Sequence, residues 1–414
     1  MKIATLSIGD ELLTGETVDT NASHIADRLY DAGGRVFKHL TVPDDVEAIA
    51  AALRELAGES DVVVVTGGLG PTPDDYTAQA AAVAAGTELE LSQGALAHLA
   101  RFEERIKGGL HPANRRQALL PKGCTLIDNP LGTACGFVVN ISGADLFFLP
   151  GVPYEMERML AESVLPPLAK RLPAPWRRVT LKLFGIPEAA IAERLAGVFP
   201  ENSPVQLAYC VKYPEIHLIL RSAAEHAGLL KEAVEAVRER LESFVFAKDG
   251  ETMDDRLALL FRESGLTLAL AESCTGGMIA SRITAVAGSS AYFLEGNVTY
   301  SNEAKTRMLK VPAELIEAHG AVSSEVARAM ATGAREAAGS DLALSVTGIA
   351  GPDGGTAEKP VGTVYLALAD ASCCLVERYN FQGDRAGVRS ITCFTALDWL
   401  RNYLLTLHGK TGRN

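Results

Sequence analysis

Four segments in the last third of the sequence carry residue types that suit acyl transfer. They are AESCTGG (Ala271–Gly277), GNVTYSNEAK (Gly296–Lys305), SVTGIAGPDGG (Ser345–Gly355) and FQGDR (Phe381–Arg385). The first follows an expected strand and opens an expected helix, so Ser273 would stand at a sharp turn beside backbone donors of Thr275, Gly276 and Gly277. That geometry suits a nucleophile next to an anion or oxyanion pocket. A serine hydroxyl needs a base, and because these segments contain no histidine, Lys305 is the candidate.

Tyr300 and Arg385 complete the candidate site. Tyr300 could orient the lysine or donate to a substrate, and Arg385 could pair with a phosphate through two N–H groups. Each residue also has a plain structural interpretation, as a helix cap, a solvated helix residue, a core side chain or a surface ion pair. Their coincidence at strand ends and helix starts of one expected domain favours the catalytic interpretation.

Two further motifs follow expected strands near the N-terminus, SIGDELLTGETVDTN (Ser7–Asn21) and TGGLGPTPDD (Thr66–Asp75). Consecutive glycines let backbone N–H groups approach a phosphate, and a following helix N-terminus favours an anion. Asp10, Glu11, Asp74 and Asp75 would bring carboxylates to the same rim, and the loop LPGVPYEM adds Glu155. Backbone donors next to carboxylates suit a phosphate held with a divalent metal. The alternative is that the glycines form ordinary turns and the acids cap helices.

The expected elements that position these motifs indicate three domains, at 1–170, 171–250 and 251–414. Alternating strand and helix signals over the first 170 residues, with the continuous apolar strand Asp61–Thr66, predict a mostly parallel sheet with helices on both faces. A proline-rich joint (Pro166–Trp176) precedes about 80 residues of βαββα pattern, which resemble a KH-like fold without a G-x-x-G loop. The last segment predicts a second α/β domain. The fold class is therefore α/β, with two mostly parallel α/β domains joined by a small α+β domain.

Composition narrows the class of protein. The 414 residues carry a formal net charge of −12, with 48% hydrophobic and 22% charged residues, as in folded proteins. The charge argues against a broad nucleic-acid surface. The sequence shows no membrane span or signal peptide, and its seven scattered cysteines and eight histidines show no disulfide framework or zinc spacing. We expect a cytoplasmic protein.

The N-terminal motifs IGDELLTG, TGGLGPTPDD, NPLGTACGF and LPGVPYEM resemble the molybdopterin-binding-like domain of the CinA (competence/damage-inducible) family. The resemblance implies a fold shared with molybdenum-cofactor synthesis proteins and a metal-dependent ADP-ribose pyrophosphatase, using Mg, Mn or Co. It implies Asp10, Glu11, Asp74, Asp75 and Glu155 as metal ligands. It implies substrate binding by Gly9, Thr66, Gly67, Gly68 and Gly70. The sequence departs from the family pattern at Pro73, where lysine is common, and at Tyr154, where a small residue is common.

The C-terminal motifs AESCTGG, GSSAYFLEGNVTYSNEAK, HGAVSSEVA, VTGIAGPDGGTAEKPVGTV and GDR resemble the CinA C-terminal domain, the nicotinamide mononucleotide (NMN) deamidases. The resemblance implies hydrolysis of the NMN carboxamide to nicotinic acid mononucleotide and ammonia, with no cofactor. It implies Ser273, Lys305 and Tyr300 as catalytic residues. The substrate-binding residues that we expect here are Thr275, Gly276, Gly277, Asn302, Gly348, Gly351 and Arg385.

The leading hypothesis is therefore a homodimeric, bifunctional enzyme that recycles pyridine nucleotides, with NMN and ADP-ribose as small-molecule partners and no membrane or nucleic-acid partner. Two alternatives remain open. The N-terminal domain could be a non-catalytic module that binds a pterin or a nucleotide. The whole chain could be an accessory factor in DNA uptake or repair, which the acidic charge disfavours.

Overall fold

The computed structural model describes residues 1–106 and 109–407, which form two compact units. One unit contains residues 1–177 and 222–227, and the other contains 178–221 and the residues from 228 onward. Apart from 171–177 and 222–227, the segments predicted as middle and C-terminal domains share the second unit. The predicted end of the last domain at 414 lies outside the described residues. No helix in the described ranges is long and apolar enough to cross a membrane.

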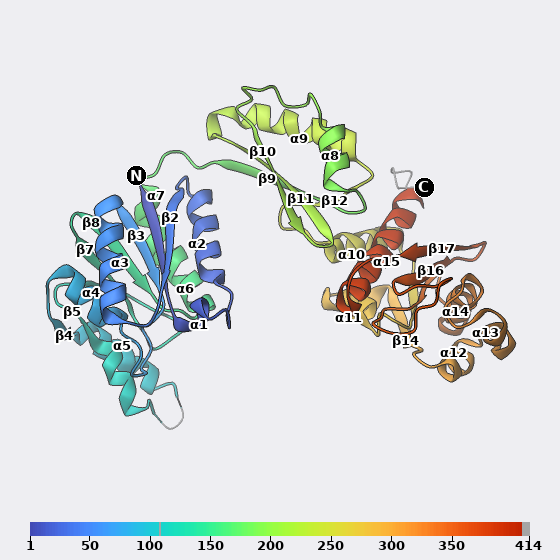
Figure 1. Cartoon of the computed structure of the whole chain (residues 1–414), viewed down its shortest axis with the longest axis horizontal. Coiled ribbons are helices and arrows are strands. Elements are labelled where there is room, and N and C mark those ends of the chain that lie inside the picture. Colours follow the sequence, from blue (N-terminus) through green and yellow to red (C-terminus); the bar gives the residue numbers. More distant parts are fainter. Residues whose placement is uncertain (107–108, 408–414) are drawn as a thin grey trace. The chain divides into compact units, whose positions relative to one another are not determined.

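The first unit is built on a six-stranded sheet with strand order β2-β1-β3-β8-β7-β6 (Figure 1). The first four strands are parallel, β7 pairs antiparallel with β8, and β6 pairs antiparallel with β7. The strands are β1 Ile3–Ile8, β2 Val36–Val42, β3 Val62–Thr66, β6 Thr125–Ile127, β7 Gly136–Ile141 and β8 Ala144–Leu149, with a separate pair β4 Leu89–Leu91 and β5 Leu119–Pro121. The helices are α1 Asp10–Leu13, α2 Thr20–Asp31, α3 Val46–Glu59, α4 Thr77–Ala85, α5 Gln93–Glu103, α6 Pro153–Met159 and α7 Leu165–Ala169.

Both faces of this sheet are buried, as the run of four valines in β3 predicts. Val62 and Val64 pack into a core with α2, α6 and α7, whereas Val63 and Val65 pack into a core with α3, α4 and α5. Successive side chains of a strand point to opposite faces, so a strand covered on both sides must be apolar throughout. The polar groups that could bind or react with a ligand therefore come from the loops at the carboxyl ends of the strands.

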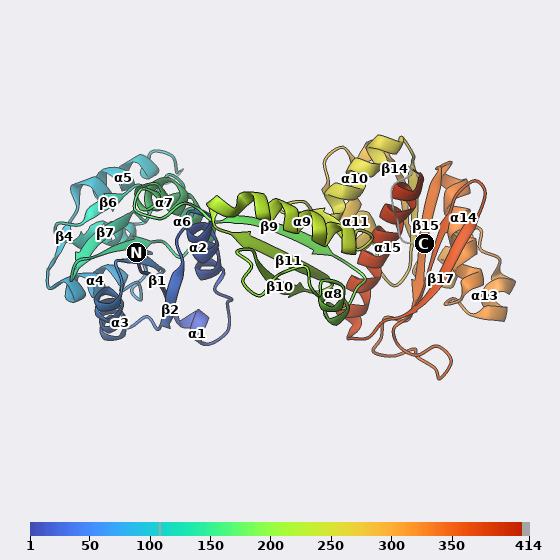
Figure 2. The same ribbon diagram turned by 90° about the horizontal axis from the view of Figure 1, so that it is seen from above.

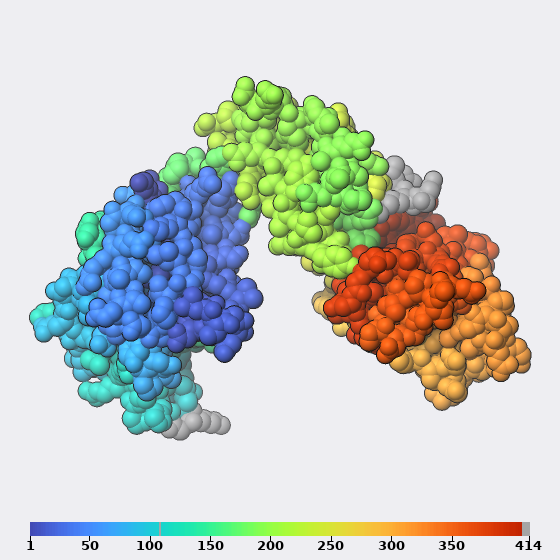
Figure 3. Space-filling view, viewed as in Figure 1, coloured from blue at the N-terminus to red at the C-terminus, as the bar shows by residue number. Residues whose placement is uncertain are grey.

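In the second unit, the middle segment folds into a four-stranded antiparallel sheet with order β10-β11-β9-β12 and two helices (Figure 2). The elements are β9 Arg177–Leu183, α8 Glu188–Arg194, β10 Gln206–Lys212, β11 Glu215–Ser222, α9 Ala227–Leu241 and β12 Val245–Lys248. The sequence analysis missed β12, whose four residues directly follow a long helix. This strand carries Phe246, which packs on Phe394 of the C-terminal segment with ring centroids 5.5 Å apart. The green middle segment and the red C-terminal helix accordingly touch in Figure 3.

The C-terminal segment forms a five-stranded sheet with order β14-β13-β15-β16-β17. Its strands are β13 Leu268–Glu272, β14 Phe293–Val298, β15 Leu342–Gly348, β16 Thr363–Ala369 and β17 Cys374–Asn380. Its helices are α10 Met253–Ser264, α11 Met278–Ala285, α12 Asn302–Leu309, α13 Ala313–His319, α14 Ser324–Ala338 and α15 Arg385–Leu407. Only the first three strands are parallel, because β15–β16 and β16–β17 are joined without a crossover helix and must pair antiparallel.

Alternating large and small residues set the helix distances around this sheet. Leu268 and Leu270 face a core with α10, α11 and α15, whereas Ala269 and Ala271 face a core with α12, α13 and α14. Small side chains let helices approach the strands closely. The same tight packing holds α12 against α14, where a Cβ at Gly333 would lie 1.9 Å from the backbone oxygen of Leu309. Helix α12 is thereby fixed close to the carboxyl end of β13.

Candidate functional site

Ser273 stands directly after the buried strand β13, as predicted. Its backbone N–H donates to Val346 O at 3.0 Å, which extends the parallel pairing of β13 with β15 by one residue. Gly276 and Gly277 then adopt φ values of 62° and 92°, in the left-handed region that favours glycine, and turn the chain into α11. The turn leaves the Ser273 side chain 8% exposed at the carboxyl edge of the sheet.

Glu272, which the sequence analysis did not single out, holds this turn together. The side chain is 1% exposed. Its carboxylate accepts hydrogen bonds from the backbone N–H groups of Gly277 at 3.0 Å, Ile279 at 3.2 Å and Ala280 at 2.9 Å. These are unpaired donors of the first turn of α11, where a carboxylate is favoured. Glu272 therefore occupies the helix N-terminus that the sequence analysis assigned in part to an anionic ligand.

Lys305 reaches Ser273 from α12. Ser301 caps this helix by accepting from Ala304 N at 3.1 Å, and Lys305 lies one turn later with 1% of its surface exposed. Its Nζ lies 3.2 Å from Ser273 Oγ, 2.8 Å from Thr299 O and 3.5 Å from Tyr300 O. The predicted pair of serine and lysine thus lies within hydrogen-bond distance in the structure.

The surroundings of Lys305 favour the neutral amine. Burial lowers the pKa of this lysine below its ordinary value of 10.5, because desolvation penalises the charged form. A neutral amine has two N–H donors and one lone pair. The carbonyls of Thr299 and Tyr300 can take the two donors, which leaves the lone pair for the Ser273 hydroxyl. This is the arrangement that a general base requires.

The side chains of Tyr300 and Arg385 form a pair of their own. Arg385 donates from Nη2 to Tyr300 Oη at 2.8 Å and from Nη1 to Gly351 O at 2.7 Å. The Tyr300 side chain is 60% exposed, and only the backbone oxygen of this residue approaches Lys305. The structure therefore joins Tyr300 to the expected substrate-binding residues Arg385 and Gly351, and a catalytic role for the phenol stays a prediction.

The other expected substrate-binding residues lie around this turn. Gly276 N donates to Ser273 O and Gly277 N to Glu272, so two of the three expected backbone donors are already used. The hydroxyl oxygen of Thr275 is buried without a hydrogen-bond partner in the described part of the chain. Asn302 is exposed at the first position of α12.

Two residues complete the surroundings of the turn. At Gly348 a Cβ would lie 3.1 Å from Cys274 Sγ, so this glycine allows close packing behind Ser273. Arg389, which the sequence analysis missed, supports the turn by donating to Thr275 O at 2.9 Å.

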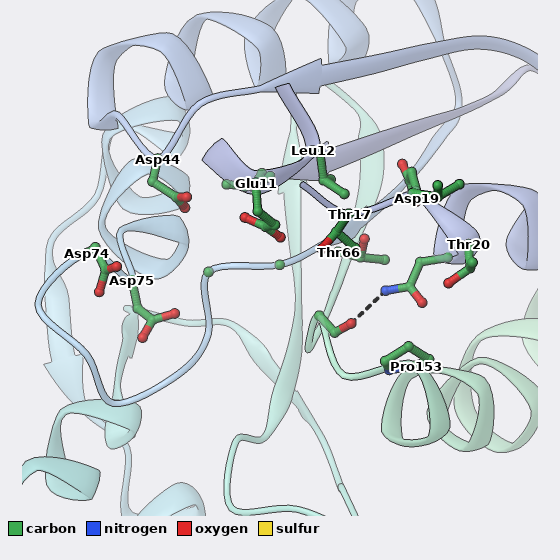
Figure 4. A pocket seen from close by; sticks show the side chains of 17 residues that line it. Glu11, Leu12, Thr17, Asp19, Thr20, Asp44, Thr66, Asp74, Asp75 and Pro153 are labelled. Carbon is green, nitrogen blue, oxygen red and sulfur yellow. Dashed lines mark hydrogen bonds between the residues drawn. The ribbon is translucent and has the colours of Figure 1, made fainter. Parts of the chain in front are cut away.

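A pocket of about 310 Å³ opens at the carboxyl ends of β1 and β3 in the first unit (Figure 4). Its lining includes Gly9, Glu11, Thr66, Gly67, Gly68, Asp74 and Asp75 from the predicted set. It also includes Asp19, Asn21 and Asp44, which the sequence analysis did not name. The two predicted motifs therefore meet at one site.

Asp44 links the carboxyl ends of β1 and β2 through hydrogen bonds with Asp10. Asp10 N donates to Asp44 Oδ2 at 3.0 Å, and Asp44 N donates to Asp10 Oδ1 at 3.3 Å. Burial raises the pKa of Asp44, and the negative charges of Asp10, Glu11 and Asp74 raise it further. The charged form of Asp44 is therefore disfavoured by three neighbouring carboxylates. Asp44 could have been found from sequence, since it follows β2 as Asp10 follows β1.

Three of the expected phosphate donors and one expected metal ligand are engaged within the protein. Gly9 N donates to Val42 O at 3.2 Å. Gly67 N donates to Leu149 O, and Gly70 N donates to Asp75 Oδ1 at 2.8 Å. Asp75 also accepts from Thr72 N at 2.8 Å, so its carboxylate closes the loop between β3 and α4. Gly67 is required there because a Cβ would lie 2.1 Å from Ile8 O. These residues shape the loop, while Arg116 contributes a cation by donating to Asp75 O.

Glu155 does not join the acidic cluster, contrary to the prediction. Its side chain is 8% exposed and accepts from Asn129 Nδ2 at 2.7 Å, next to Gly132, where a Cβ would lie 2.0 Å from Glu155 Oε2. Asn129 and Gly132 belong to the NPLGTACGF motif, which Glu155 braces. Across the described residues, no three His, Cys, Asp or Glu side chains are already grouped to hold a metal ion.

Comparisons with known proteins agree with this organisation. The family described as "Probable molybdopterin binding domain" matches residues 4–170, "Damage-inducible protein CinA KH domain" matches 178–247, and "CinA C-terminal domain" matches 250–404. A solved structure of the competence/damage inducible protein CihA from Agrobacterium tumefaciens is 44% identical and covers 36% of this chain and 91% of its own, with a TM-score of 0.35.

Curated relatives align along the whole chain. The CinA-like protein of Citrifermentans bemidjiense is 77% identical over 413 residues, which cover 100% of both chains. The CinA-like protein of Geobacter sulfurreducens is 57% identical over 412 residues, which cover 98% of this chain and 100% of the relative. The chain is therefore a member of the CinA family, with a molybdopterin-binding-like domain at its N-terminus.

Proposed function

We propose that the C-terminal domain is an amidase that hydrolyses the carboxamide of NMN to nicotinic acid mononucleotide and ammonia. One observation carries the proposal, namely the buried Lys305 amine 3.2 Å from Ser273 Oγ with a lowered pKa. Membership of the CinA family supports a hydrolase. The family resemblance supplies the choice of NMN as substrate, and the exposed pair of Arg385 and Tyr300 offers polar donors suited to its phosphate.

The proposed reaction uses the serine–lysine pair in the following steps. Lys305 takes the hydroxyl proton of Ser273, whose oxygen bonds to the amide carbon and gives a tetrahedral intermediate. Lys305 then returns the proton to the amide nitrogen, the carbon–nitrogen bond breaks, and ammonia leaves. Water, activated by the same amine, adds to the acyl-enzyme and releases the carboxylate with a free serine. Glu272 keeps the serine in position throughout by fixing the start of α11.

We propose as a second activity that the N-terminal domain hydrolyses ADP-ribose to AMP and ribose 5-phosphate with a divalent ion. The carboxylates of Asp10, Glu11 and Asp74 near Asp44 support this assignment, because a bound cation would offset the negative charge that disfavours ionised Asp44. Carboxylate oxygens are the donors that Mg²⁺ and Mn²⁺ prefer. When bound, such an ion would offset the charge of the diphosphate. The residues are not grouped as a ready site, so substrate oxygens would complete the coordination.

The first prediction concerns the nucleophile and the base. Ser273→Ala and Lys305→Met should each lower ammonia release from NMN by roughly a thousandfold or more, since the two groups act as a unit. Lys310→Met, at the exposed C-terminal end of the same helix, should keep wild-type activity. The measurement is ammonia release from NMN by each variant, after thermal unfolding has shown that the variant is folded. Activity retained in Ser273→Ala would disprove the assignment.

The pH dependence of the amidase provides a second test. The base form of Lys305 is required, so kcat should rise with pH through a pKa that burial holds below 10.5. A profile of kcat against pH should show this rising limb, and Lys305→Arg should abolish turnover at every pH because arginine stays protonated. A wild-type kcat that shows no rising limb anywhere between acid and alkaline pH would rule out a lysine base.

Glu272 should act as a positioning residue. Glu272→Gln keeps one carbonyl oxygen but turns an amide N–H₂ toward backbone donors, so the turn should shift and kcat fall by roughly tenfold to a hundredfold. The KM for NMN should change little, because Glu272 does not face the substrate. Glu303→Gln, in the exposed first turn of α12, is the control. An unchanged kcat in Glu272→Gln would show that the turn keeps Ser273 in position without the Glu272 carboxylate.

The N-terminal activity is tested by following AMP formation from ADP-ribose with Mg²⁺, Mn²⁺ or Co²⁺. Asp44→Asn and Asp74→Asn should lower the rate and weaken its dependence on the metal, whereas Glu155→Gln should leave the metal dependence unchanged, because Glu155 braces another loop. Ammonia release from NMN should be unaffected in all three variants. If the wild type forms no AMP with any of these ions, the domain is a binding module instead.

A further inference from the structure

The N-terminal pocket has two chemically different ends. In the view of Figure 4, Asp44, Asp74 and Asp75 lie on one side of Glu11 and Thr66, and Asp19, Thr20 and Pro153 lie on the other. The first end is the acidic one, to which the second activity assigns the metal and the diphosphate. The second end, formed by Asp19, Asn21, Val18 and Pro153, has no role in that assignment.

Asn21 presents a buried, unsatisfied acceptor at this second end. Its side-chain N–H₂ donates to Gly151 O at 2.8 Å, the bond drawn as a dashed line in Figure 4. This bond fixes the amide orientation, so the other atom is the carbonyl Oδ1. The residue is 8% exposed, and its Oδ1 has no hydrogen-bond partner among the residues that the structure describes. A buried acceptor in this state lowers stability until a donor pairs with it.

Asp19 adds a second acceptor of the same kind. Its Oδ1 accepts from Ala22 N at 2.8 Å and caps α2, whereas its Oδ2 is buried and has no hydrogen-bond partner within the described ranges. His39 Nε2 lies 3.5 Å from Oδ2, and when this nitrogen carries a proton, Thr41 Oγ1, at 3.2 Å, is the nearer acceptor. Two acceptors without donors, two residues apart at the start of one helix, call for a ligand group that donates hydrogen bonds.

Apolar side chains flank the two acceptors at this end of the pocket. Val18 is 80% exposed, and it lines the pocket together with Leu12 and Pro153. Apolar surface beside fixed polar groups is typical of small-molecule sites, in which the polar groups set orientation. A phosphate would not fit here, because it would bring acceptor oxygens to acceptor oxygens.

We infer that the Asp19–Asn21 end of the pocket is the subsite for the part of the nucleotide that donates hydrogen bonds, either a ribose hydroxyl or the exocyclic amine of the base. The inference rests on the proposed N-terminal activity and deepens it. Asn21 Oδ1 accepts from the ligand, Asp19 Oδ2 takes a second donor, and Val18 and Pro153 cover the ring. Substrate orientation follows, with the diphosphate at the carboxylates and the donor group at the start of α2.

The test measures binding of AMP and of ribose 5-phosphate, the two expected products, by calorimetry with Mg²⁺, so that no bond remains to be hydrolysed. Asn21→Leu, which keeps the size and removes the acceptor, should weaken the binding of one of them roughly tenfold. Asn21→Ala serves if the leucine variant does not fold. Asn140→Leu, near the C-terminal end of β7, is the control and should bind as the wild type does.

Analogues identify the donor. Inosine monophosphate lacks the amine, 2′-deoxy-AMP and 3′-deoxy-AMP each lack a ribose hydroxyl, and 2-deoxyribose 5-phosphate tests the second sugar. The analogue that lacks the relevant donor should bind the wild type roughly tenfold more weakly, and this penalty should vanish in Asn21→Leu. Equal affinity of wild type and Asn21→Leu for both products, or no binding by the wild type, would overturn the subsite. AMP formation from ADP-ribose is assayed separately, so a domain that binds without hydrolysing would refute the activity and leave the subsite standing.

Discussion

The C-terminal site depends on keeping the Lys305 amine out of water. A lysine is hydrated by preference, so its burial must be enforced by the packing of everything around it. The alanines of β13 and the glycine of α14 let α12 approach, and α12 then delivers Lys305 to the carboxyl edge of the sheet. The carbonyls of Thr299 and Tyr300 satisfy the N–H groups without adding charge. An acidic partner would have raised the pKa and removed the base.

Glu272 shows why the nearest carboxylate in sequence does not have that effect. It directly precedes Ser273, yet its oxygens are occupied by three backbone N–H groups of α11. The partial positive charge of the helix N-terminus and the negative charge of the carboxylate offset each other. The turn that carries Ser273 is therefore held in place and has little net electrostatic field. In the N-terminal pocket the balance differs, because burial and the negative charges of Asp10, Glu11 and Asp74 raise the pKa of Asp44, although a hydrogen bond from Thr72 and the charge of Arg116 lower the pKa of Asp74. The negative charge of Glu272 at the C-terminal site is offset within the protein, whereas the carboxylates of the N-terminal pocket favour binding of an external cation.

Sequence patterns predicted the framework and the closeness of Ser273 and Lys305, because both follow from local rules. The four valines of β3 required a strand buried on both faces, and Ser273 and Lys305 were recognisable from residue type and expected position at strand ends and helix starts. Side-chain direction was not readable. Glu155 turns toward Asn129 and Asp75 toward its own loop, and nothing in their spacing distinguishes them from Asp74. Asp44 and Glu272 were missed because each resembles an ordinary surface or capping acid until long-range contacts are known.

The net charge of −12 constrains how either site can recognise a nucleotide. The field of the whole protein repels an anionic ligand at long range, so affinity must come from contacts made after arrival. In the C-terminal domain the groups that we propose for those contacts are Arg385 and Tyr300, since Glu272 already occupies the helix N-terminus. In the N-terminal domain the carboxylates would worsen the repulsion unless a cation accompanies the phosphate. Buried acceptors such as Asn21 Oδ1 then select the ligand by its donors, an interaction that net charge does not weaken.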